Sequence, residues 1–197
     1  MTPEPVAIAE TRLLHTMHRA ATSLLAEAAT RDTSAPAALT ELRDFLVAAL
    51  RHHHESEDDV LWPRLAAAGA PLADLSAEHD VLDAALDRLA AAAVPGPQLA
   101  AAAADVRDLV HQHLDHEEPV LFPALAAHLS DQEWAAFSSA VIASAPPVGL
   151  HLNFGFFERV GTPEELAAVA ANLPPEALAA VPVLREQARA TLKGLGS

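Results

Sequence analysis

Apolar residues recur along this chain at intervals of three and four, the spacing of one helix face, in four successive segments. The first segment begins near Val6. The second begins at Ser34 and Pro36, where the serine can cap a helix and the proline costs no hydrogen bond in the first turn. The third spans about residues 72–93 and the fourth about residues 98–129. Four helices of similar length joined by short breaks predict an all-α protein built on an up-down-up-down antiparallel four-helix bundle.

More helices are predicted beyond the fourth segment. Ser130–Glu133 is a capping box, which opens a shorter helix that ends near Ala143. The stretch 145–149 contains two prolines and a glycine and is interpreted as a boundary, after which further helix-start signals follow. We therefore expect residues 1–144 to form the bundle with one short following helix. Residues 145–197 are expected to form a C-terminal helical appendage that packs on it.

Part of the second helix is repeated in the fourth helix, sixty residues further along the chain. The repeated part contains a histidine followed four residues later by a glutamate, first as His53 and Glu57. The same pair recurs as His113 and Glu117. Four residues are about one helical turn, so the two side chains of a pair leave the same face, ~6 Å apart. That face is otherwise apolar, and buried imidazoles and carboxylates need a partner, of which a metal ion is the commonest.

The first and third helices each place one histidine on their apolar face, His18 and His79. His15 also lies in the first helix, but on a face with threonines and an arginine, so His18 is the predicted inward residue. His54 aligns with Leu114 in the repeat and is interpreted, like the remaining histidines, as solvated or structural. Each of the four helices thus offers one inward histidine, and two of them add an inward glutamate.

Four histidines and two carboxylates exceed the four ligands that a zinc ion normally takes. They suit two ions bridged by the carboxylates, each ion keeping terminal histidine ligands and an open position. The chain has no cysteine, which excludes thiolate sites and iron–sulfur clusters. Imidazole with carboxylate favours iron or manganese over copper(I) or structural zinc. Open positions on reducible ions are what O₂, peroxide or nitric oxide chemistry requires.

These motifs, with the Leu-Trp-Pro and Leu-Phe-Pro tails that follow the paired residues, resemble the hemerythrin-like family, also called the HHE cation-binding domain, over about residues 10–130. The resemblance implies a four-helix bundle with two non-haem iron ions bridged by Glu57 and Glu117, manganese or zinc being less expected. It also implies O₂ binding, peroxide or nitric oxide handling, or iron and oxygen sensing. The ligands expected are His18, His53, Glu57, His79, His113 and Glu117.

One position departs from the pattern of the oxygen-carrying members of that family. They have a fifth histidine four residues after the ligand of the third helix, where this chain has Asp83. The departure weakens the expectation of reversible O₂ carriage. Asp83 is kept as an additional candidate ligand, together with Glu118, which the longer spacing of the carriers would select, and His15.

Composition and charge restrict the partners. The formal net charge of −15 disfavours binding to nucleic acid or to an anionic membrane. The chain has no apolar run of the ~20 residues that cross a bilayer, and it shows no signal peptide, so a cytoplasmic location is expected. No histidine has a glutamate three residues before it, which disfavours ferritin-like iron storage.

Two functions stay open from the sequence. The first is a di-iron protein that binds or converts a small diatomic molecule or peroxide. The second is a module that senses iron or oxygen, or binds an unspecified protein partner, without turnover. The sequence does not decide whether the protein is an enzyme.

Overall fold

The computed structural model describes residues 4–31, 35–70, 73–171, 173 and 175–196. These residues form helices and no strand, which confirms the prediction of an all-helical protein. Ser34 and Leu72, at the predicted starts of two helices, lie outside the described residues. Within the described part of the chain, no helix combines the length and the hydropathy that crossing a membrane requires.

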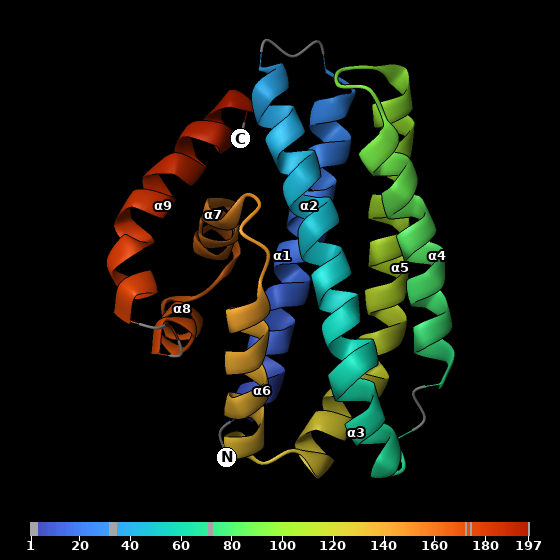
Figure 1. The fold of residues 1–197 in the computed structure, drawn as a ribbon, viewed down its shortest axis with the longest axis vertical. Coiled ribbons are helices and arrows are strands. Elements are labelled where there is room, and N and C mark those ends of the chain that lie inside the picture. The colour runs from blue at the N-terminus through green and yellow to red at the C-terminus, as the bar shows by residue number, and fades with distance from the viewer. Residues whose placement is uncertain (1–3, 32–34, 71–72, 172, 174, 197) are drawn as a thin grey trace.

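Four long helices lie side by side in Figure 1, and consecutive ones run in opposite directions. α1 contacts α2 and α5, and α4 also contacts α2 and α5, so each of the four has two long neighbours and all four face one interior. The bounds are α1 (Val6–Ala29), α2 (Pro36–Ser56), α4 (Ala73–Ala91) and α5 (Pro97–His128).

The second helix does not end at Pro63 but continues through a π-helical turn, η1 (Glu57–Leu61), into α3 (Trp62–Ala67). A proline has no N–H to donate, and its ring crowds the carbonyl four residues earlier. A wider turn just before Pro63 relieves this crowding, and the N–H of Trp62 accordingly bonds to the carbonyl of Glu57, five residues back. Glu57 thus begins an irregular turn at the centre of the molecule.

The C-terminal helices pack on α1 and α2 (Figure 1). α6 begins at the predicted capping box of Ser130 and Glu133, which is confirmed by both of its hydrogen bonds. α7 contacts α1, α2 and α9, and α8 contacts α1. The bounds are α6 (Asp131–Ser144), α7 (Leu150–Val160), α8 (Pro163–Ala171) and α9 (Pro175–Gly194).

The apolar core consists of two clusters. The larger one joins the long helices to α7 and α9, and in it Phe45 stacks on Phe156 with ring centroids 6.2 Å apart. The smaller one surrounds α3 and the end of α5 and includes Trp62, Leu121 and Trp134. Along the long helices, buried histidines and glutamates occur where one cluster gives way to the other.

The contact between α7 and α9 is closest at Gly155, where an added Cβ would lie 2.5 Å from the Cβ of the fully buried Ala188. Gly155→Val should overpack this contact and lower the free energy of unfolding by about 1–3 kcal/mol, measured by urea denaturation. Gly194→Ala in α9 is the control, because its Cβ would meet Ala35 and Ala38 at an ordinary 3.5 Å. Equal stability of the two variants would contradict this packing.

Candidate metal centre

Eight buried polar side chains from all four long helices and η1 meet in the interior. None of them is more than 8% exposed. α1 contributes two, α2 two, η1 one, α4 one and α5 two. They are His15, His18, His53, His54, Glu57, His79, His113 and Glu117.

Seven of these residues form two groups whose ligand atoms lie within 4.8 Å of one another inside each group. The three-histidine group contains His54, His79 and His113. The four-residue group contains His15, His53, Glu57 and Glu117.

Glu57 belongs to the four-residue group and also faces the three-histidine group. Its Oε1 is 3.7 Å from Nε2 of His53, and its Oε2 is 3.6 Å from Nε2 of His79. Both distances exceed an ordinary hydrogen bond. Two ligand atoms that are each ~2.1 Å from a common ion lie ~3–3.5 Å apart, which is close to these separations.

Glu117 occupies a corresponding position on α5. Its Oε2 lies 3.4 Å from Nε2 of His113 in the three-histidine group and 3.7 Å from Nε2 of His15 in its own group. Each carboxylate therefore faces one histidine of each group. This is the arrangement that two ions sharing two carboxylates require.

Carboxylates outside the groups orient the histidines of the three-histidine group. Nδ1 of His79 lies 3.0 Å from Oδ2 of Asp58, and Nδ1 of His113 lies 2.9 Å from Oε2 of Glu78. An ionised carboxylate only accepts, so each Nδ1–H donates and the Nε2 atoms point toward the interior. The two Nε2 atoms lie 3.2 Å apart, within hydrogen-bond distance. With both rings neutral, each Nε2 would offer a lone pair to a cation between them.

Asp83 and Glu118, two of the three additional candidate ligands from the sequence, lie outside both groups. Each lies within hydrogen-bond distance of a histidine of one group. Oδ1 of Asp83 is 3.4 Å from Nδ1 of His54, and Oε1 of Glu118 is 3.2 Å from Nδ1 of His15. Burial opposes ionisation of Glu118, but hydrogen bonds from His15 and Arg19 lower its pKa to about 2. Both carboxylates therefore act as hydrogen-bond acceptors that fix the direction of an imidazole.

Burial sets the charge of three central histidines; at His113 it is outweighed by Glu117 and Glu78, which raise the pKa. Burial lowers the pKa of His18 to about 3 and that of His54 to about 2, and it lowers the pKa of His53 well below its ordinary value. Neutral imidazoles are the form that binds metals. Burial, and then repulsion from Glu117, raise the pKa of Glu57 well above its ordinary value. A cation next to the two carboxylates would remove that repulsion.

Several buried atoms at this centre make no hydrogen bond of ordinary geometry within the described residues. A buried polar atom left in this state costs about 1–3 kcal/mol. Metal ions in the two groups would satisfy most of them, so the residues present fit a pair of ions. The atoms are Nε2 of His15, Nδ1 of His18, Nε2 of His53, Oε2 of Glu57 and both carboxylate oxygens of Glu117.

The structure brings five of the six predicted ligands into the two groups. The sixth, His18, is 1% exposed and lies beside the four-residue group, with its ring centroid 4.9 Å from that of His53. The five are His53, Glu57, His79, His113 and Glu117.

Two histidines of these groups were not among the six predicted ligands. His54 is 2% exposed, and the repeat contained a signal for this, because its aligned partner Leu114 is apolar and also buried. His15 was ranked below His18 because its face carries threonines. Thr11 and Thr22 are themselves buried, at 6% and 1% exposure, so that polar face points inward.

The aromatic residues of the two repeated tails cover one histidine each. Trp62 stacks on His79 with centroids 6.1 Å apart, and Phe122 stacks on His15 at 6.2 Å. They shield one imidazole of each group from water.

Replacing His54 tests the three-histidine group. His54→Ala should lower the metal content by about one ion per chain, because it removes one of three imidazoles around one position. Elemental analysis measures this. His52→Ala is the matched control, because the ring of His52 pairs with Ser144 outside both groups, at 3.0 Å. Equal metal content in the two variants would contradict the assignment of His54.

Replacing an outer carboxylate tests the orientation of the histidines. Asp58 accepts hydrogen bonds from His79 and from Ser76, the latter at 2.9 Å. Asp58→Asn should weaken metal affinity by about 10–100-fold, measured by competition with a chelator. The neighbouring Asp59 is exposed, so Asp59→Asn should retain the affinity of the unaltered protein. An unchanged affinity in Asp58→Asn would show that this hydrogen bond does not support the site.

The geometry agrees with comparisons against known proteins. A family model described as the hemerythrin HHE cation binding domain matches residues 9–125, more than half of the chain. Searches of curated proteins and of solved structures give no match. With a match of this extent, and with histidines and glutamates gathered inside it, the chain belongs to the hemerythrin HHE cation-binding domain family.

Proposed function

We propose that α1, α2, α4 and α5 form an up-down-up-down bundle that holds two non-haem iron ions, and that the protein binds or reacts with O₂, peroxide or nitric oxide there. The observation that carries this proposal is the position of Glu57 and Glu117 between two groups of histidines. Membership of a cation-binding family supports it.

Each ion has its own set of ligands in this proposal. The three-histidine group holds one ion, and His15 with His53 holds the other. Glu57 and Glu117 are shared by both. The chain has no cysteine, and imidazole with carboxylate suits iron, ahead of manganese or zinc.

The smaller number of imidazoles in the four-residue group supports a further ligand there, either His18 or a small molecule. The four-residue group has two histidines where the other group has three. Iron ions bound there would supply an open coordination position for O₂, peroxide or nitric oxide. His18 stays in the proposed ligand set, because it adjoins the group with fewer imidazoles and its Nδ1 makes no hydrogen bond of ordinary geometry within the described residues.

The chain's own residues limit what happens at such a position. Trp62 and Phe122 cover His79 and His15, and buried leucines flank them, so water is kept away from these two imidazoles. The sequence contains neither tyrosine nor cysteine as a second redox group. This favours ligand binding or disproportionation over the oxidation of a substrate. We also propose the division of the chain into residues 1–144 and 145–197, with the second part packed on the first.

Reactivity can be tested on protein loaded with ferrous iron under anaerobic conditions. We expect addition of O₂, peroxide or nitric oxide to change the visible absorption, and Glu117→Ala to abolish the change, because both groups lose a shared carboxylate. Asp115→Ala is the matched control on α5, since its side chain is 73% exposed.

Electrode measurements of peroxide or O₂ consumption then distinguish turnover from binding alone. Protein that carries its iron but responds to none of the three molecules would contradict the proposed reactivity.

A further inference from the structure

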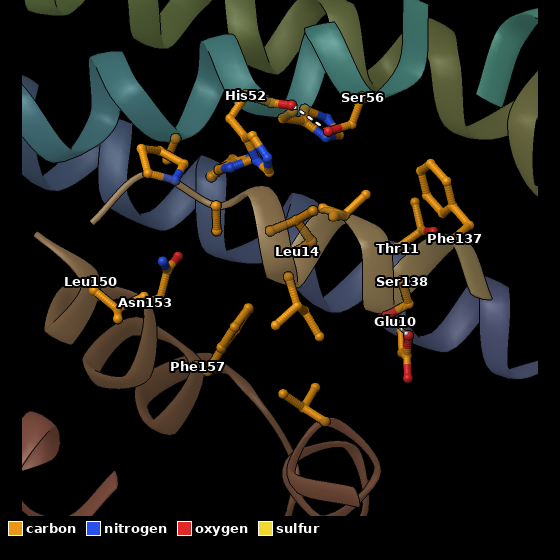
Figure 2. Close-up of a pocket in the computed structure, with 18 of the residues that line it drawn as sticks. Glu10, Thr11, Leu14, His52, Ser56, Phe137, Ser138, Leu150, Asn153 and Phe157 are labelled. Atoms are coloured by element: carbon orange, nitrogen blue, oxygen red, sulfur yellow. Dashed lines mark hydrogen bonds between the residues drawn. The ribbon is translucent and has the colours of Figure 1, made fainter. Parts of the chain in front are cut away.

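A cavity of about 250 Å³ lies between the long helices and the C-terminal helices. Figure 2 shows Leu150, Asn153 and Phe157 of α7 pointing into it from one side, with His52 and Ser56 of α2 on the opposite side. α1, α6 and α8 complete the wall, which is mostly apolar. The cavity exists because the C-terminal helices pack on α1 and α2.

The inner end of this cavity reaches the candidate metal centre. His18, His53 and Glu57 line it. Among the described residues of its wall, none comes from α4 or α5, so it approaches the four-residue group and not the three-histidine group. A molecule in the cavity would therefore lie next to the group with fewer imidazoles.

The charges in the wall select against an anion. Two carboxylates line the cavity, Glu10 and Glu57, and no lysine or arginine occurs among the described lining residues. Glu10 already accepts hydrogen bonds from Nε1 of Trp134 at 2.7 Å and from the hydroxyl of Ser138 at 3.3 Å. An anionic ligand would lose its hydration and find no lysine or arginine to pair with, which favours a neutral occupant.

Two buried polar atoms of the wall are available for a hydrogen bond. Oγ1 of Thr11 and Nδ1 of His18 make no hydrogen bond of ordinary geometry within the described residues. The two residues are 6% and 1% exposed and lie two turns apart on α1, on the same face as Leu14. Because His18 is a proposed metal ligand, the hydroxyl of Thr11 is the group left for a molecule in the cavity, and it can donate to or accept from a second hydroxyl group.

The volume limits the size of the occupant. It is larger than the ~150 Å³ cavity that holds one benzene molecule, and smaller than the ~300 Å³ at which pockets for drug-sized ligands begin. We propose that this cavity binds a neutral, largely apolar organic molecule of about one substituted ring, whose hydroxyl group pairs with Thr11 near the metal centre. Binding of this kind goes beyond the proposed function and does not require the ions.

Isothermal titration calorimetry with p-ethylphenol, on the protein as purified, tests this proposal. We expect one molecule to bind per chain, and Ala49→Phe, which fills the cavity from α2, to weaken binding at least ~10-fold. Ala101→Phe is the matched control, because Ala101 is exposed on α5, away from the cavity, and it should bind as the unaltered protein does. Absence of binding, or equal binding by Ala49→Phe and Ala101→Phe, would overturn the proposal.

A second variant covers the case in which Ala49→Phe does not fold. Leu150 lines the cavity and is 38% exposed, so Leu150→Trp fills the space from α7 at a position that tolerates a larger side chain. It too should weaken the binding of p-ethylphenol. In chelator-treated protein, the charged analogue p-ethylbenzoate should bind at least ~10-fold more weakly than the phenol, because the wall has no lysine or arginine to pair with it. Benzoate binding as tight as phenol binding would contradict the neutral class of ligand.

Discussion

Glu57 and Glu117 approach each other in the interior, and the ion-pair partners that they have among the described residues are histidines. Two carboxylates buried in this way cost several kcal/mol unless positive charge compensates them. Burial keeps three of the surrounding imidazoles neutral, while Glu117 and Glu78 raise the pKa of His113. Metal ions would supply the positive charge that neutral imidazoles lack, and the placement of the remaining polar residues fits that role.

Some of the chain's acidic residues have a structural role around this centre. Asp58, Glu78, Asp83 and Glu118 accept hydrogen bonds on the outer sides of four histidines, so that each imidazole turns its other nitrogen inward. Negative charge around a cationic centre also lowers the energy of the cation at a distance. Part of the net charge of −15 therefore belongs to the site and is not only a solvated surface.

Much of the fold followed from local rules. Apolar periodicity, capping boxes and prolines located the helices, because these signals act within a few residues of the chain. The π-helical turn did not follow in the same way. Pro63 and Pro123 occupy equivalent positions in the repeat, yet a π turn precedes Pro63 whereas Pro123 lies inside regular α5. Which response a proline produces depends on the packing of its neighbours, and a short sequence window does not contain that information.

The sequence predicted those residues of the candidate metal centre that belong to the repeat. Matching His53 and Glu57 to a second pair identified the two glutamates that are buried among the histidines, because both pairs occupy one register. His54 was missed because its missing counterpart in the repeat was interpreted as exposure. His15 was kept only as an additional candidate, because its neighbours are polar. Burial is decided by the facing helices, and here an inward stripe is wide enough for adjacent histidines to enter it. The cavity could not be predicted from the sequence, because the packing of α6, α7 and α8 against α1 and α2 forms it.

Anomalous diffraction at the iron edge, from crystals of iron-loaded protein, tests the central claim most directly. The structure predicts two peaks in the interior of the four long helices, both contacted by the carboxylates of Glu57 and Glu117. A single peak, or peaks that lie away from these carboxylates, would contradict the claim that two ions share them. The imidazoles expected at one peak are those of His54, His79 and His113, and at the other those of His15 and His53.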